Sequence, residues 1–201
     1  MKLKDFKVEL RKAVPIIVRP EDLERDPRLK FMVHFMMTLK GLVKDFEYDC
    51  MKDACNLPHC CKPCNAWTFN TEVIIEQDLP ILSECFSGDP LNAFYTAEKG
   101  CALPWGARPV NCLTFICPRT HPIERTMFEA LVAQPLKAIR RFLWEYSRAN
   151  SADYQLKVYQ QVLANYEKWP GIVIDNLERY MDIMNDFQRV LNDRSTMGDG
   201  A

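Results

Sequence analysis

The sequence lacks a long apolar run and a surplus of either charge. No segment approaches the roughly 18 consecutive apolar residues of a membrane-spanning helix. Residues 1–7 alternate charged and apolar side chains and do not resemble a secretory signal. Lysine and arginine number 26 against 27 aspartates and glutamates, whereas nucleic-acid-binding proteins carry a basic surplus. We therefore expect a cytoplasmic protein that binds neither membranes nor nucleic acid.

Familiar catalytic patterns are also missing. The chain has three histidines, and none belongs to a recognisable Ser-His-Asp arrangement. No glycine-rich strand-to-helix loop of the kind that holds phosphates is present. The residues therefore leave open whether the protein is an enzyme.

Cysteine, by contrast, is abundant and confined to one part of the chain. All nine cysteines lie between Cys50 and Cys117. Disulfides are rare in the cytoplasm, and an odd number of cysteines leaves one unpaired. Scattered core cysteines would not gather beside prolines in this way. We interpret them as metal ligands, because thiolates bind zinc and iron tightly.

The cysteines form two groups, C-x4-C-x4-C-C-x2-C from Cys50 to Cys64 and C-x10-C-x4-C from Cys101 to Cys117. These spacings match neither a zinc ribbon nor a bacterial ferredoxin. They therefore leave open whether the centre is an iron–sulfur cluster or zinc. For Cys85, a core position and a ligand position are equally favoured. The predicted ligands are Cys55, Cys60, Cys61, Cys101, Cys112 and Cys117, followed by Cys50 and Cys64.

Several sequence features occur together between residues 50 and 117. They are the doublet Cys60-Cys61, the apolar–acidic segment 73–78, Cys101, and Arg108-Pro109 followed by Cys112, Phe115 and Cys117. This combination resembles the YkgJ-type cysteine-cluster proteins, a bacterial family described as zinc- or iron-chelating. The resemblance covers about a third of the chain and implies metal binding. Four residues separate Cys55 from the doublet where the family has two, and Cys64 is extra.

A similar cysteine cluster occurs in flagellin lysine methylases. This likeness implies a protein-lysine methylase-like activity as a further alternative. The chain shows no glycine-rich loop for S-adenosylmethionine, which weakens that alternative.

Side chains next to the cysteines have expected roles as well. Arg108 should offset the negative charge of the thiolates and donate to sulfur. His59 is expected not to be a metal ligand. His34 is expected to lie on the apolar side of a helix spanning residues 29–43, in the core of the protein. Four aromatic residues are expected to cover the centre and exclude water: Trp67, Phe69, Trp105 and Phe115.

The predicted fold class is mainly α, with an irregular cysteine-rich metal-binding core and a C-terminal bundle of about three helices. We divide one compact domain into residues 1–49, 50–119 and 120–201. A short strand is expected over 71–75 and a helix over 77–85. The C-terminal helices are expected over 123–148, with a kink at Pro135, and over 153–169 and 176–192, with a break at Pro170-Gly171.

The leading functional hypothesis is a metal-binding protein with a redox role or an accessory role to an enzyme. The alternative is a structural-zinc protein whose helices present a binding face to an unknown protein partner.

Overall fold

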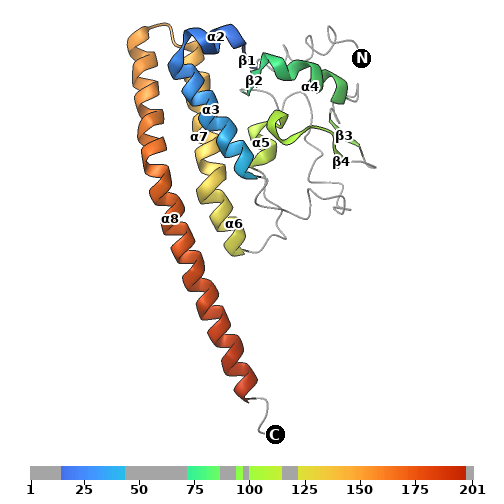
Figure 1. Cartoon of the computed structure of the whole chain (residues 1–201), viewed down its shortest axis with the longest axis vertical. Coiled ribbons are helices and arrows are strands. Elements are labelled where there is room, and N and C mark those ends of the chain that lie inside the picture. The colour runs from blue at the N-terminus through green and yellow to red at the C-terminus, as the bar shows by residue number, and fades with distance from the viewer. Residues whose placement is uncertain (1–14, 44–71, 87–93, 97–99, 115–121, 198–201) are drawn as a thin grey trace.

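The computed structural model describes residues 15–43, 72–86, 94–96, 100–114 and 122–197, and these residues form a mainly helical protein (Figure 1). The predicted helical class is therefore confirmed. The elements in chain order are β1 (Ile16–Val18), α2 (Pro20–Arg25), α3 (Pro27–Leu42), β2 (Val73–Ile75), η4 (Glu76–Asp78), α4 (Leu79–Cys85), β3 (Tyr95–Thr96), β4 (Gly100–Cys101), η5 (Trp105–Ala107), α5 (Val110–Leu113), α6 (Pro122–Phe128), η6 (Glu129–Ala133), α7 (Gln134–Arg148) and α8 (Ala152–Met197).

Helix α3 confirms the helix predicted for this region. The Asp26 carboxylate accepts hydrogen bonds from the amides of Arg28 and Leu29, at 3.0 and 3.2 Å, and Pro27 occupies the first turn, where it needs no amide partner. One side of the helix is buried, with Met36 and Leu39 fully enclosed. His34 is exposed. The expectation that it lies in the core was wrong, because the stripe of buried positions passes on either side of it.

The predicted irregularity at Pro135 takes the form of one π-helical turn, η6, between α6 and α7. Proline has no amide hydrogen, so the bond that position 135 of a regular helix would give to the Leu131 carbonyl is missing. The indole N–H of Trp169 in α8 donates to this carbonyl instead, at 3.1 Å. The neighbouring helix thus supplies the donor that Pro135 removes, and α7 continues beyond it.

Helix α8 is a single helix of 46 residues with Pro170 inside it. The predicted break at Pro170-Gly171 was therefore wrong, and so was the division into two helices. Trp169 and Val173 pack on the main core on either side of the proline, and this packing outweighs the loss of one helical hydrogen bond. The helix runs beside α3 and α7 and continues past the start of α6 (Figure 1).

Two small sheets and two cores complete the described part. Strand β1 pairs with β2 in parallel, with Ile16 opposite Val73, and this confirms the strand predicted near residue 75. Strands β3 and β4 pair antiparallel, with Tyr95 opposite Cys101. The main core lies between α3, η6, α7 and α8. A smaller core forms around Ile74, α4 and the β3–β4 hairpin.

Among the helices of the described ranges, none is both long enough and apolar enough to span a bilayer. The expected division at residues 49 and 119 falls at or near segments 44–71 and 115–121, which lie outside the described residues. These boundaries stay predictions.

Candidate metal centre

The second cysteine segment is built on short elements that begin with the β3–β4 hairpin. Cys101 ends β4, and the amide of the next residue, Ala102, donates to the Phe94 carbonyl at 2.8 Å. The chain then turns through η5 to Pro109 and enters α5. The cysteine-rich region was expected to be irregular; within the described residues its second segment is a hairpin followed by two single turns.

Cys112 lies on the outward side of α5. The Pro109 carbonyl accepts from the amides of Cys112 and Leu113, at 3.0 and 3.1 Å, which closes the turn. Val110 and Leu113 are fully buried, whereas Cys112 between them is only partly buried. The apolar anchors on both sides therefore hold the Cys112 thiol at the surface of the core.

A buried charged pair fixes the loop before Cys112. The Lys40 ammonium donates to the carbonyls of Gly106 and Arg108, at 3.3 and 3.0 Å. The Glu72 carboxylate accepts from the Val110 amide through Oε2 at 2.8 Å. Lys40 Nζ and Glu72 Oε1 are 3.9 Å apart, and these side chains are 4% and 1% exposed. We call Lys40 and Glu72 the loop clamp.

The two clamp residues also bound the first cysteine group in sequence. Lys40 lies in the last turn of α3, shortly before segment 44–71, and Glu72 directly follows that segment. The clamp therefore connects described residues on both sides of the first group to the loop that leads to Cys112. This link spans 68 residues between Lys40 and Arg108.

Burial opposes the charged forms of both clamp residues. It lowers the pKa of Lys40, although the attraction of Glu72, and to a lesser extent of Asp78 and the Cys112 thiolate, acts in the opposite direction. Burial raises the pKa of Glu72, while Lys40 and the Val110 amide act to lower it. Each charge is thus held by the other and by backbone groups. The Lys40 ammonium and the Cys112 sulfur attract each other, and the thiolate is the form of cysteine that binds metals.

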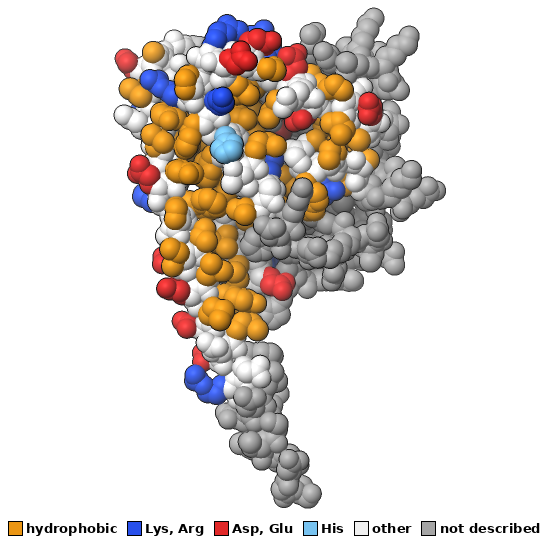
Figure 2. Space-filling model, viewed as in Figure 1, with side chains coloured by type: hydrophobic (Ala, Val, Ile, Leu, Met, Phe, Trp, Pro, Cys, Tyr) orange, Lys and Arg blue, Asp and Glu red, His pale blue; other side chains and the backbone are white. Residues whose placement is uncertain are grey.

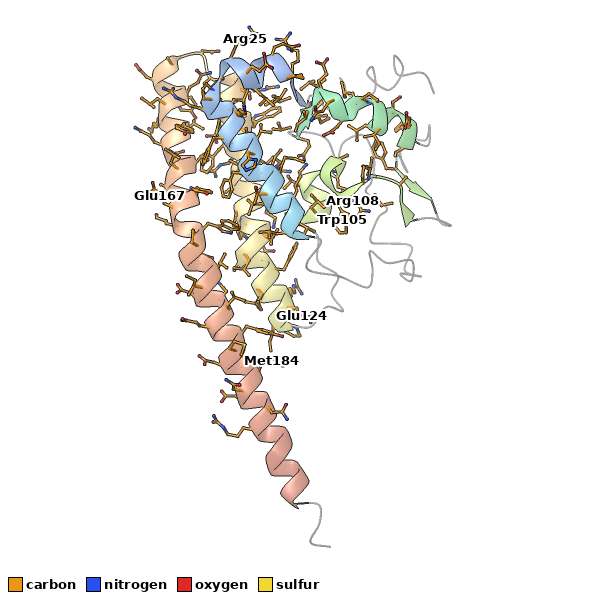
Figure 3. All side chains as sticks on the ribbon, viewed as in Figure 1. Arg25, Trp105, Arg108, Glu124, Glu167 and Met184 are labelled. Carbon is orange, nitrogen blue, oxygen red and sulfur yellow. The ribbon has the colours of Figure 1, made fainter. Side chains whose placement is uncertain are left out.

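Arg108 supports the same loop. Its Nε donates to the Leu103 carbonyl at 2.9 Å, and its guanidinium lies 4.3 Å from the centre of the Trp105 ring. Figure 3 shows the two side chains next to each other on this loop. Trp105 also packs on the main core. The expected contact of Arg108 with sulfur stays a prediction, and the geometry adds a role in bracing the backbone between Leu103 and Pro109.

Cys85 packs against the small core. It is the last residue of α4, and its thiol donates to the Ala102 carbonyl at 3.3 Å. Cys85 and Cys101 are both partly buried against this core. Burial and the nearby Glu84 raise the pKa of the Cys85 thiol, which disfavours the thiolate form needed for metal binding. The geometry thus favours Cys85 as a packing residue.

The remaining predicted positions lie outside the described residues. Within the described ranges, Cys85, Cys101 and Cys112 form no disulfide with one another, and no three of the histidine, cysteine and acidic side chains described lie close enough to hold a metal ion. Whether the two cysteine groups meet stays a prediction. The positions outside are Cys50, Cys55, His59, Cys60, Cys61, Cys64, Trp67, Phe69, Phe115 and Cys117.

Sequence reasoning missed the clamp, although the sequence carries a signal for it. Lys40 follows Met36 by four residues and precedes Val43 by three, so it lies on the apolar stripe of α3. Glu72 directly precedes a strand of three buried apolar residues. A basic residue on one buried face and an acidic residue beside another indicate a buried pair, because a buried charge needs a partner.

Comparison with known proteins gives no match: no family model, no curated protein and no solved structure is similar to this chain.

Proposed function

We propose that the protein binds a metal centre, an iron–sulfur cluster or zinc, through thiolates of both cysteine groups. Cys112 is the central described ligand and Cys101 is the second. The single observation that carries this proposal is the loop clamp. This buried pair ties Lys40 and Glu72, which flank the first cysteine group, to the loop before Cys112, and it therefore supports the proposal that the two groups converge.

The exposure of the described cysteines also supports the proposal. Free cysteine is among the most frequently buried residue types, yet the two proposed ligands, Cys101 and Cys112, are both partly exposed. A cysteine that only fills a core has no reason to lie at its edge. When bound, the metal would supply either a redox centre or a rigid cross-link between the two groups. The clamp residues and Arg108 would hold the backbone of the second group in place.

Anaerobic purification followed by elemental analysis and a visible spectrum tests the proposal. Broad sulfur-to-iron absorption with iron in stoichiometric amount would identify a cluster and support a redox or accessory role. A colourless protein with stoichiometric zinc would identify a structural site. Anaerobically purified wild-type protein that contains neither iron nor zinc, or whose cysteines are joined as disulfides, would contradict metal binding.

The substitution Cys112→Ser should remove most of the bound metal and lower the stability of the fold, because metal binding and folding are coupled. The matched control is Cys85→Ser, which alters a partly buried thiol at the edge of the small core and should keep the metal content of the wild type. Metal content per chain, measured on folded protein, decides between them. Equal metal content in Cys112→Ser and the wild type would remove Cys112 from the ligand set.

The apolar surface of α8 favours a second candidate function, a helical face for a protein partner. From Ile172 onward the helix exposes large apolar side chains, and Figure 2 shows hydrophobic groups along this part of the molecule. Exposed apolar surface can mark an interaction site. The side chains concerned are Ile172, Ile174, Leu177, Met181, Ile183 and Met184.

A further inference from the structure

A small cavity lies beside the loop clamp, and the metal-binding proposal does not use it. Its volume is about 10 Å³, and its lining combines three ionisable side chains, Lys40, Glu72 and Asp78, with apolar residues such as Val73 and Leu82. A space of this size holds one water molecule and nothing larger. The cavity thus has the volume of a site for one water molecule, and its lining includes three ionisable side chains.

The Glu72 carboxylate has an unused acceptor at this cavity. Oε2 accepts from the Val110 amide, whereas Oε1 is completely buried and accepts no hydrogen bond from any described residue. Lys40 Nζ is 3.9 Å from Oε1, which is too far for a direct hydrogen bond. A buried carboxylate oxygen without a donor is costly, so the site calls for a small donor at this position.

Lys40 can supply the other half of a bridge. An ammonium group has three hydrogens, and within the described residues two of them are used for the carbonyls of Gly106 and Arg108. The third remains for an acceptor in the cavity. Asp78 adds a half-buried carboxylate to the same lining as Lys40. Together these groups offer a donor and two acceptors, the two to four partners that a buried water needs.

We propose that this cavity binds one structural water molecule, which donates to Glu72 Oε1 and to the Asp78 carboxylate and accepts from the Lys40 ammonium. The water completes the hydrogen bonding of the clamp across the 3.9 Å gap between its two side chains. A cation is disfavoured as the occupant, because the Lys40 ammonium already supplies a positive charge at the cavity wall.

A high-resolution crystal structure of the full chain tests the proposal directly. We expect one ordered water about 2.7–3.2 Å from both Glu72 Oε1 and Lys40 Nζ. An empty cavity with Lys40 Nζ moved into direct contact with Oε1 would overturn the proposal. A metal ion in this position would overturn it as well.

Magnetic resonance in solution gives a second test that needs no crystal. Magnetisation transfer from a long-lived water to the amides of Val73 and Ile74 is expected in the wild type. It should persist in Glu72→Gln, which keeps a polar partner, and disappear in the double variant Lys40→Met with Glu72→Leu. Exchange of the exposed pair, Glu129→Leu with Lys137→Met, is the control and should leave the signal unchanged. Absence of the signal in the wild type would overturn the proposal even where the double variant does not fold.

Discussion

Lys40 and Glu72 illustrate how single residues connect segments that are distant in the chain. Each is almost completely buried, and each uses its charge on backbone groups of the loop from Gly106 to Val110. Their placement on apolar stripes was visible in the sequence, whereas their pairing was not, because periodicity says which face is buried and not what lies opposite it. The two cysteine groups could likewise be recognised from their spacing along the sequence. Whether they meet in the folded protein could not be predicted from that spacing.

The first residue-scale prediction concerns Lys40→Met. Removing the ammonium leaves the buried Glu72 carboxylate unpaired, which should lower the free energy of unfolding at neutral pH by about 3–5 kcal/mol. Urea unfolding measures the loss. Lys137→Met is the matched control, because its ion pair with Glu129 is 40% and 37% exposed, and it should cost less than about 1 kcal/mol.

The cost of Lys40→Met should also depend on pH. The pKa of Glu72 is already raised in the folded protein, and loss of Lys40 raises it further. Because a raised carboxyl pKa favours the protonated folded form, the penalty is full above that pKa and is relieved as the pH falls toward the ordinary value of 4.5. A destabilisation that stays constant or grows on acidification would show that Glu72 is not the group left unpaired.

A second residue-scale prediction concerns Tyr146. Its hydroxyl donates to Asp26 Oδ2 at 2.8 Å, and burial together with the Asp26 carboxylate raises the pKa of Tyr146 to about 12. Asp26→Asn removes the negative charge and should move the pKa toward 10.0, the unperturbed value. Titration of the Tyr146 ring-carbon resonance measures the shift. Asp22→Asn, which alters an exposed pair with Arg19, should leave it unchanged.

The sign of the linked stability follows from the same shift. A raised folded pKa means that Tyr146 contributes stability below pH 10, and that this contribution is lost as the pH rises through about 12. Asp26→Asn should therefore weaken the loss of stability in this alkaline range. If Asp26→Asn and the wild type lose the same stability between neutral and alkaline pH, the Asp26 carboxylate is not the cause of the raised pKa of Tyr146.

At the scale of elements, most predicted helix boundaries lie within two residues of the observed ones, whereas the break at Pro170-Gly171 is absent. Asp26-Pro27 begins α3, because the Asp26 cap and the early proline both act within one turn. Pro170-Gly171 does not end α8, because the helix is held by Trp169 and Val173 in the core. Tertiary packing of this kind cannot be read from the two residues themselves. The short turns η5 and α5 escaped prediction because their backbone is fixed by the clamp.

The junction of η6 and α7 gives an element-scale prediction. Trp169→Phe removes the indole N–H that serves the Leu131 carbonyl and should lower the free energy of unfolding by about 1–3 kcal/mol. Trp144→Phe is the control; that ring lies under the Arg148 guanidinium at 3.9 Å, and its loss should cost about 1 kcal/mol or less. Thermal unfolding of both variants measures the difference.

Restoring the missing donor sharpens this test. Pro135→Ala returns an amide at position 135, so the Trp169→Phe substitution should cost less in the Pro135→Ala background than in the wild type. Equal costs in the two backgrounds would show that the indole stabilises the junction by packing alone.

At the scale of the whole molecule, the mainly helical class followed from periodic apolar stripes, and it is what the described residues form. The arrangement of the helices did not follow, since the sequence indicated three C-terminal helices where one rod (α6, η6 and α7) and one long helix are present. The metal centre itself remains a prediction of the cysteine pattern. What the structure adds is the clamp, which joins described residues on either side of the first cysteine group to the loop before Cys112.

The long helix gives a whole-molecule prediction. Side chains from Met181 to Asp186 are exposed, so a chain ending at Tyr180 should unfold within about 1 kcal/mol of the full chain. A chain ending at Glu167 removes Trp169 and Val173 from the main core and should be severely destabilised. Comparing both in urea separates the two parts of α8. A large loss for the longer truncated chain would mean that the far end of the helix is packed against the rest of the protein.

The length of α8 has a consequence for how the molecule rotates in solution. At 1.5 Å per residue, 46 residues span ~69 Å, whereas a sphere-like chain of 201 residues has a radius of gyration of about 16 Å. End-over-end reorientation should therefore be slower than spinning about the helix axis. The N–H bonds of α8 lie nearly parallel to that axis. The transverse relaxation of the α8 amide nitrogens should therefore be faster than that of the β1–β2 amide nitrogens.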